Sequence, residues 1–129
     1  MSTGIREMLD AANAVVPRIT PDEAQAMIAR GGVLVVDVRE PPELQTSGKI
    51  AGALNVSGGM LEFRADPQSP HHDPRFDKTK TTILYCASGT RSALAGKLLK
   101  DMGYEKVFNL GGSKDWAVAG GAVDFPQVL

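Results

Sequence analysis

Cysteine, tryptophan and histidine are scarce in this sequence of 129 residues, which contains one Cys, one Trp and two His. A single cysteine excludes an internal disulfide framework and any metal site built from several thiolates. Neither sign of charge dominates, because 15 Asp and Glu face 14 Lys and Arg. Without a basic excess, neither nucleic acid nor an anionic membrane surface is an expected partner.

Long apolar runs are also absent. No stretch reaches the roughly 18–20 apolar residues that a membrane span needs. The first ten residues carry two acids and lack the apolar stretch of a secretory signal. A lone cysteine without such a signal indicates a reducing compartment, so we expect a cytoplasmic protein with no membrane association.

What the sequence does contain is typical of one globular domain, with 43% hydrophobic and 22% charged residues. Apolar residues recur at helical spacing over residues 4–14, and Pro17 ends that pattern. We therefore expect an N-terminal helical extension (1–17), a main domain (18–125) and a C-terminal tail (126–129). The extension is expected to pack on the main domain, with docking of a second subunit as the alternative.

Strands and helices are expected to alternate along the main domain. Residues 33–38 form a β-branched run that is typical of a strand buried on both faces of a parallel sheet. Thr20 and Pro21 are a strong helix start, and Gly31 ends that helix. The expected strands are residues 33–38, 53–56, 81–86 and 107–110, and the expected helices are residues 21–30, 41–46, 91–102 and 113–119. This order predicts an α/β domain with a mainly parallel central sheet and helices on both faces.

Residues 57–80 are rich in Gly, Pro, Ser, Asp and His, and we expect them to form a long surface connection with one helical turn at 60–63. On this interpretation Met60, Leu61 and Phe63 either line the mouth of an active site or cover the edge of the sheet. The adjacent histidines at 71 and 72 lie near acidic residues, but their spacing fits no zinc pattern. A solvated loop without a metal is therefore expected there.

The segment with the clearest chemical signal begins where the strand 81–86 ends. It consists of Cys86, Ala87, Ser88, Gly89, Thr90, Arg91 and Ser92. In open α/β sheets, ligands bind beyond the carboxyl ends of the strands. The unpaired N–H groups at the start of the next helix stabilise an anion and lower the pKa of a nearby thiol. Small residues at 87–89 allow several N–H groups to point inward, and Arg91 supplies a charged fork for an oxyanion.

The residues of this segment also have structural interpretations. A lone cysteine at a strand end is most often a buried packing residue, but the surrounding loop favours a reactive Cys86. The hydroxyls of Thr90 and Ser92 either bind substrate or cap the following helix.

Charged residues after the first strand invite a second functional interpretation. One possibility is that the charged side chains at the end of the buried strand bind substrate. These are Asp37, Arg39 and Glu43. A structural role is favoured, in which the three form a hydrogen-bonded network that fixes the loop after the strand. Within that network we expect Arg39 to pair with Glu43.

Three motifs in this order resemble those of the rhodanese-like sulfurtransferases in their single-domain form. The first comprises residues 37–40, Glu43 and residues 48–56, the second is the segment 86–92, and the third comprises residues 109–112, 115–116 and 120–121. The resemblance extends from about residue 19 to residue 123, which is most of the chain. Lys49 departs from the pattern, because the family usually has a histidine there, which is generally interpreted as structural.

The resemblance implies a three-layer rhodanese-like domain and an enzyme that transfers a sulfane sulfur from thiosulfate or a related donor. Cys86 would carry the sulfur as a persulfide, and the loop residues 87–92 would bind the substrate. The acceptor would be cyanide in an assay and a thiol in the cell, with no cofactor or metal. The rhodanese-like phosphatases carry a loop one residue longer, which argues against that activity. An arsenate reductase and a non-catalytic sulfur-binding or regulatory module stay open as alternatives.

Overall fold

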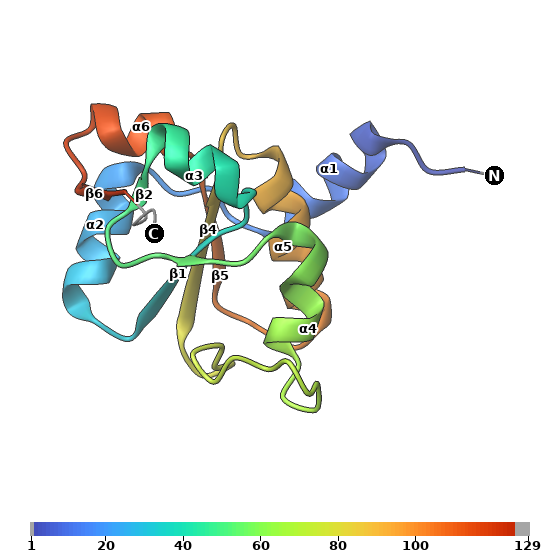
Figure 1. Ribbon diagram of the computed structural model, residues 1–129. Coiled ribbons are helices and arrows are strands. Elements are labelled where there is room, and N and C mark those ends of the chain that lie inside the picture. The colour runs from blue at the N-terminus through green and yellow to red at the C-terminus, as the bar shows by residue number, and fades with distance from the viewer. Residues whose placement is uncertain (1, 126–129) are drawn as a thin grey trace.

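The computed structural model describes residues 2–125 (Figure 1). Its centre is a parallel sheet of four strands in the order β3-β1-β4-β5. These strands are β1 (Val33–Asp37), β3 (Leu54–Asn55), β4 (Thr81–Cys86) and β5 (Val107–Gly112). The predicted α/β class with a mainly parallel sheet is confirmed. The predicted C-terminal tail, 126–129, lies outside the described residues.

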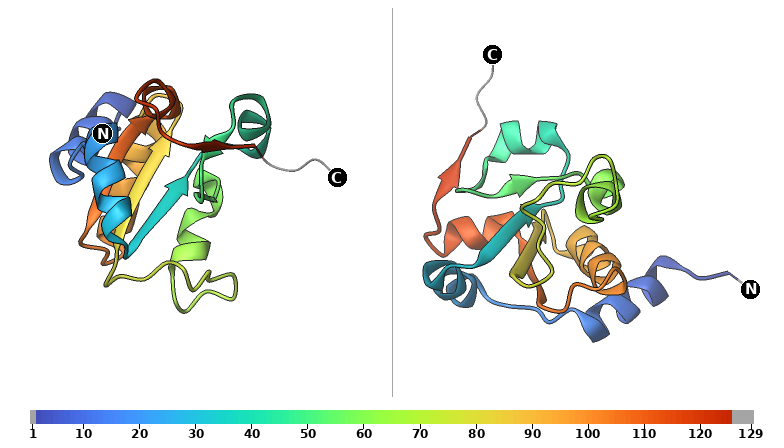
Figure 2. Two further views of the ribbon diagram at one scale, coloured as in Figure 1. Left: turned by 90° about the vertical axis from the view of Figure 1, so that its left-hand side faces the viewer. Right: turned by 90° about the horizontal axis from the view of Figure 1, so that it is seen from below.

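Helices cover both faces of the sheet (Figure 2). Helices α1 (Ile5–Val15), α4 (Leu61–Ala65) and α5 (Thr90–Asp101) lie on one side, and α2 (Pro21–Arg30) and α6 (Ser113–Val118) lie on the other. Alternate side chains of β4 enter the two cores because successive residues of a strand point to opposite faces. Leu84 and Cys86 join the core beneath α5, while Ile83 and Tyr85 join the core with Trp116.

Local signals place the helices next to the sheet. Helix α2 begins at the predicted capping box: Thr20 Oγ1 accepts the Glu23 N–H at 3.1 Å, and Glu23 Oε1 accepts the Thr20 N–H at 2.9 Å. Helix α1 packs against α5 through the buried Ala12 and Val16. Gly96 of α5 makes this close approach possible, because a Cβ there would lie 2.8 Å from Val16.

Several segments differ from the sequence prediction. A short antiparallel pair is formed by β2 (Lys49–Ile50) and β6 (Val123–Asp124). Strands of two residues are too short to show a recognisable pattern in a sequence. Helix α3 (Pro41–Ser47) matches the prediction closely, but β3 is shorter than expected and β5 is longer. The connection 57–80 contains a 3₁₀ turn, η1 (Gly58–Met60), followed by α4.

The connection 57–80 is more than a surface loop. Leu61, Ala65 and Phe76 are buried in the core beneath α5, and the Tyr104 hydroxyl donates to the Ala65 carbonyl at 2.6 Å. The expectation of exposure for Leu61 is therefore wrong, although Met60 and Phe63 are exposed. Within the described range, no helix combines the length and apolarity that crossing a membrane would take.

A buried ion pair fixes the chain beyond β1. Asp37 and Arg39 are almost completely buried, and Arg39 Nη2 lies 2.7 Å from Asp37 Oδ2. Arg39 also donates to the Gly48 carbonyl at 2.7 Å and to Ser47 Oγ at 2.8 Å. Its guanidinium carbon lies 5.6 Å from the centre of the Tyr85 ring. This side chain therefore connects the end of β1 to the end of α3.

Replacement of Arg39 tests this structural role. Arg39→Ala leaves the buried Asp37 carboxylate without its partner, and we expect a loss of about 3–5 kcal/mol in the free energy of unfolding, measured by urea denaturation.

Lys97→Ala is the control for this measurement. Lys97 pairs with Asp101 at 2.9 Å, and the two side chains are 39% and 63% exposed. Its loss should cost less than about 1 kcal/mol. Equal losses for the two variants would contradict the assigned role of Arg39.

Candidate active site

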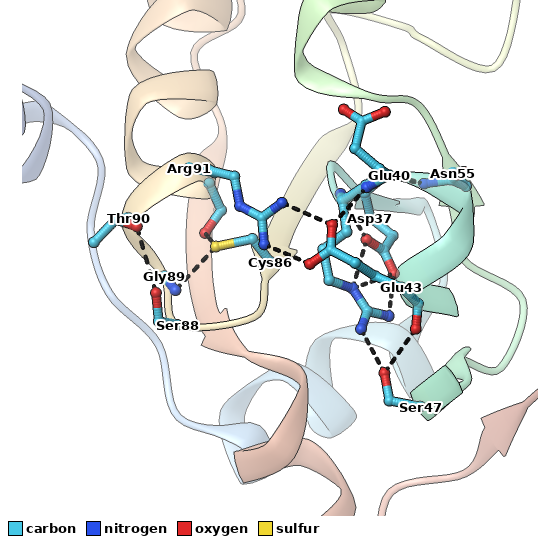
Figure 3. Close-up of polar contacts among 12 residues, drawn as sticks. Asp37, Glu40, Glu43, Ser47, Asn55, Cys86, Ser88, Gly89, Thr90 and Arg91 are labelled. Atoms are coloured by element: carbon cyan, nitrogen blue, oxygen red, sulfur yellow. Dashed lines mark hydrogen bonds and ion pairs between the residues drawn. The ribbon is translucent and has the colours of Figure 1, made fainter. Parts of the chain in front are cut away.

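Cys86 lies at the carboxyl end of β4, directly before the loop that leads into α5 (Figure 3). Its side chain is completely buried, and its thiol is free. Gly89, the N-cap of α5, has a φ of 97°, which side chains rarely tolerate. This backbone conformation turns the chain back over the sulfur, so that the Gly89 N–H donates to Cys86 Sγ at 3.0 Å.

Ser92 supplies a second polar contact to the sulfur. Its Oγ lies 3.4 Å from Cys86 Sγ and 2.7 Å from Asn109 Oδ1, and its single proton can be donated to either acceptor. Asn109 in turn donates from Nδ2 to the Gly89 carbonyl at 3.0 Å, and its Oδ1 accepts the Gly111 N–H at 2.9 Å. Asn109 therefore holds the loop in place from the neighbouring strand.

The environment of Cys86 favours its thiolate. Burial raises the pKa of the Cys86 thiol, because a charged sulfur loses its hydration. Hydrogen bonds from the Ser92 side chain and from the backbone N–H groups of residues 88, 89 and 92 lower this pKa. The hydrogen bonds outweigh burial, so the pKa of Cys86 lies below its usual range. The loop is thus suited to a negatively charged sulfur.

Arg91 pairs with Glu43 across the mouth of the site. Its Nη1 and Nη2 atoms donate to the two carboxylate oxygens of Glu43 at 2.8 and 2.9 Å. The Arg91 guanidinium holds the pKa of the Glu43 carboxyl at about 2. The expected pairing of Arg39 with Glu43 is therefore wrong. Arg39 is neutralised by Asp37 instead, and Glu43 turns outward to Arg91.

The structure brings the predicted loop residues together, but their hydroxyls play unequal parts. Ser92 is buried against Cys86, whereas Ser88 and Thr90 are exposed and lie 3.4 Å apart, Oγ to Oγ1. Neither Thr90 nor Ser92 caps α5, because Gly89 occupies the N-cap position and no side chain caps it. Ala87, in the same loop, is exposed.

Two residues that contact the loop were not predicted from the sequence as part of the site. Asn109 gave a weak signal as a polar residue in an otherwise apolar strand. Arg18 gave none, although its guanidinium packs on the two glycines beside the loop. A Cβ at Gly89 would lie 3.0 Å from Arg18, and one at Gly111 would lie 2.2 Å from it. Both glycines also have positive φ, so each position favours glycine for its backbone conformation as well as for the space that Arg18 occupies.

Two hollows flank the site. One, of about 280 Å³, lies beside Arg91 and has mainly apolar walls that include Val38, Leu61 and Leu94. The other, of about 480 Å³, lies beside Glu43 and also borders Ala87. Within residues 2–125, no group of three His, Cys, Asp or Glu side chains is placed to hold a metal ion.

The comparisons with known proteins agree with this geometry. A family model described as "Rhodanese-like domain" matches residues 20–119. The protein therefore belongs to the rhodanese-like domain family, and the resemblance seen in its three motifs is confirmed.

Several curated relatives are sulfurtransferases. Thiosulfate sulfurtransferase PspE of Escherichia coli (strain K12) is 35% identical over 83 residues, which are 64% of this chain and 73% of PspE. A sulfurtransferase of Allochromatium vinosum is 33% identical over 96 residues, 74% of this chain and 81% of the relative. Larger tRNA uridine(34) hydroxylases also match, and the alignments span 28% of the Teredinibacter turnerae protein and 34% of the Bartonella bacilliformis protein.

A solved structure from Rhodopseudomonas palustris has a very similar fold. It superposes with a TM-score of 0.89 at 42% identity and covers 96% of each chain. That protein is described as one of unknown function and a possible tyrosine phosphatase.

The pH dependence of Cys86 alkylation tests the electrostatics of the site. Iodoacetamide reacts with the thiolate, so its rate should rise with pH through a midpoint below the roughly 8.5 of a free thiol. Ser92→Ala removes the hydroxyl that can donate to the thiolate and should raise this midpoint. Glu43, with its pKa of about 2, does not titrate in this range.

Ser88→Ala is the control, because it keeps the backbone N–H and removes an exposed hydroxyl that faces Thr90. Its midpoint should match that of the unaltered protein. A midpoint that Ser92→Ala leaves in place would show that the hydroxyl does not stabilise the thiolate.

Proposed function

We propose that this protein is a sulfurtransferase that accepts a sulfane sulfur from thiosulfate or a related donor as a persulfide on Cys86. One observation carries the proposal: backbone N–H groups and the Ser92 hydroxyl converge on Cys86 Sγ and stabilise it as an anion. The family membership and the sulfurtransferase relatives support the same conclusion.

In the first step the Cys86 thiolate attacks the outer sulfur of thiosulfate. A bond forms between Sγ and that sulfur, and the bond between the two thiosulfate sulfurs breaks. Its electron pair leaves with the sulfonate group as sulfite. The persulfide on Cys86 carries one negative charge, and the loop N–H groups that face Sγ are suited to stabilise it. No proton has to move, because the attacking group is already a thiolate.

In the second step a nucleophilic acceptor attacks the outer sulfur of the persulfide, and Cys86 leaves as the thiolate. Cyanide serves in the assay, and we propose a small thiol in the cell. This cycle is a two-step transfer through a covalent intermediate. It requires Cys86 to stay reduced, which fits the cytoplasmic location that we propose.

Arg91 is the residue best placed to bind the oxyanion of the donor. Its guanidinium lies at the mouth of the Cys86 loop and already holds a carboxylate in a two-point contact. A sulfonate group presents oxygens at a similar spacing, and guanidinium groups bind such anions in the same forked manner.

Phosphatase and arsenate reductase activity are the competing enzymatic functions. The description of the Rhodopseudomonas palustris structure raises the first, and the anion-binding loop suits the second. The loop N–H groups stabilise the sulfur anion that each of these enzymes would need. The length of the loop argues against a phosphatase, because Arg91 follows Cys86 by only five positions. A non-catalytic sulfur-binding module would also use the thiolate, but it would hold the sulfur without passing it to an acceptor.

Intact mass measurement tests the proposed function. Reduced protein incubated with excess thiosulfate should gain one sulfur atom, and cyanide should remove it with release of thiocyanate. Cys86→Ser keeps the size of the side chain and should show no gain, because its hydroxyl is not ionised at neutral pH.

Glutathione persulfide and polysulfide are the further donors to try. If no donor modifies Cys86, the proposal is wrong, and hydrolysis of an aryl phosphate or thiol-dependent reduction of arsenate should then be measured on the same two proteins.

A further inference from the structure

The sulfur that the proposed function requires is closed off in this structure. Cys86 is 0% exposed, although its reaction needs contact with a donor. The Arg91 guanidinium lies between Cys86 and Glu43, and the two side chains meet through two hydrogen bonds (Figure 3). These side chains belong to different elements, Glu43 to α3 and Arg91 to α5. The ion pair therefore bridges the two sides of the site.

The two side chains of the ion pair border different hollows beside the site. Arg91 borders the hollow of about 280 Å³, and Glu43 borders the hollow of about 480 Å³. Ala87, the residue that follows Cys86, lies on the Glu43 side. Cys86 itself borders neither hollow while the two side chains are paired.

A further hydrogen bond orients the Arg91–Glu43 pair, but both side chains are partly exposed to water. Glu43 Oε2 accepts a second hydrogen bond, from the Glu40 N–H at 2.9 Å, which orients the carboxylate toward Arg91. The side chains of Arg91 and Glu43 are 44% and 35% exposed. Ion pairs with this exposure are weak, because water solvates the separated charges. An incoming anion can therefore take the place of Glu43.

We infer that Glu43 is the specificity-determining residue of this site: its carboxylate closes the Cys86 loop through Arg91, and a donor gains access by replacing that carboxylate on the guanidinium. This inference rests on the proposed function for the identity of the donor. A sulfonate group can make the same two-point contact as the carboxylate. A neutral reagent cannot, and it reacts only when the pair opens by itself.

Two alkylating reagents of nearly equal size test this inference without any sulfur transfer. Iodoacetate carries a carboxylate and iodoacetamide does not, and both modify the Cys86 thiolate. In Glu43→Gln no carboxylate competes for Arg91, so the ratio of the iodoacetate rate to the iodoacetamide rate should rise about five-fold. Intact mass gives both rates, and a thermal melt checks that the variant is folded.

Glu40→Gln is the matched control. It removes the same charge from the start of the same helix. Glu40 borders the same hollow as Arg91, but its carboxylate points away from the guanidinium (Figure 3). Its rate ratio should stay within about two-fold of the unaltered protein. An unchanged ratio in Glu43→Gln, or an equal rise in Glu40→Gln, would overturn the inference.

Glu43→Asp separates closure from charge. The shorter side chain keeps the negative charge but cannot make the two-point contact at the present backbone spacing. We expect iodoacetamide to react faster than with the unaltered protein, because the site is no longer closed. An iodoacetamide rate that does not change would overturn the closing role of Glu43.

Thiosulfate turnover provides the arm that depends on the proposed function. If Cys86 forms a persulfide, Glu43→Gln should lower KM for thiosulfate about five-fold with kcat nearly unchanged. If no persulfide forms in the unaltered protein, the proposed function fails, while the alkylation ratio still decides the role of Glu43.

Discussion

The buried pair of Asp37 and Arg39 is the constraint on which the rest of the site depends. Two opposite charges at the end of β1 are removed from water, and each is tolerated there only because the other is present. Arg39 uses its remaining donors on the end of α3, and Asn55 donates to the carbonyls of Asp37 and Arg39. Helix α3 is thereby fixed to the sheet, and Glu43 on that helix is placed within reach of Arg91.

The thiolate of Cys86 is stabilised mainly by groups that carry no net charge. Two of the arginines near the site, Arg39 and Arg91, are already paired with carboxylates, one in the core and one at the surface. The stabilisation of a sulfur anion at Cys86 therefore comes mainly from aligned backbone N–H groups and one hydroxyl. Such fixed dipoles are buried and are screened little by salt, in contrast to exposed ion pairs. Arg91 also interacts with the sulfur, but its main partner is the exposed carboxylate of Glu43.

Sequence reasoning succeeded where short-range chemistry decides the structure and failed where distant segments meet. The capping box at Thr20 and the turn before α5 depend on neighbouring residues, so both could be read from the sequence. Glu43 and Arg91 are far apart in the chain, and their pairing depends on where α3 is docked. The same holds for the contacts of Arg18 with Gly111 and for the pairing of β2 with β6, which no local pattern encodes. Burial of Phe76 was missed because its surroundings are polar in sequence.

The segment between α1 and α2 has a consequence for how this sheet meets other molecules. Asn109 of β5 donates its N–H to the Pro17 carbonyl, and its own carbonyl accepts the Ile19 N–H. This short parallel bridge covers part of the outer edge of β5, while the opposite edge belongs to β3, which is two residues long. Open strand edges are templates for pairing with another chain. Because one edge of the sheet is partly covered and the other is a very short strand, another chain has little open backbone to pair with. The fold therefore disfavours aggregation by addition of strands to the sheet.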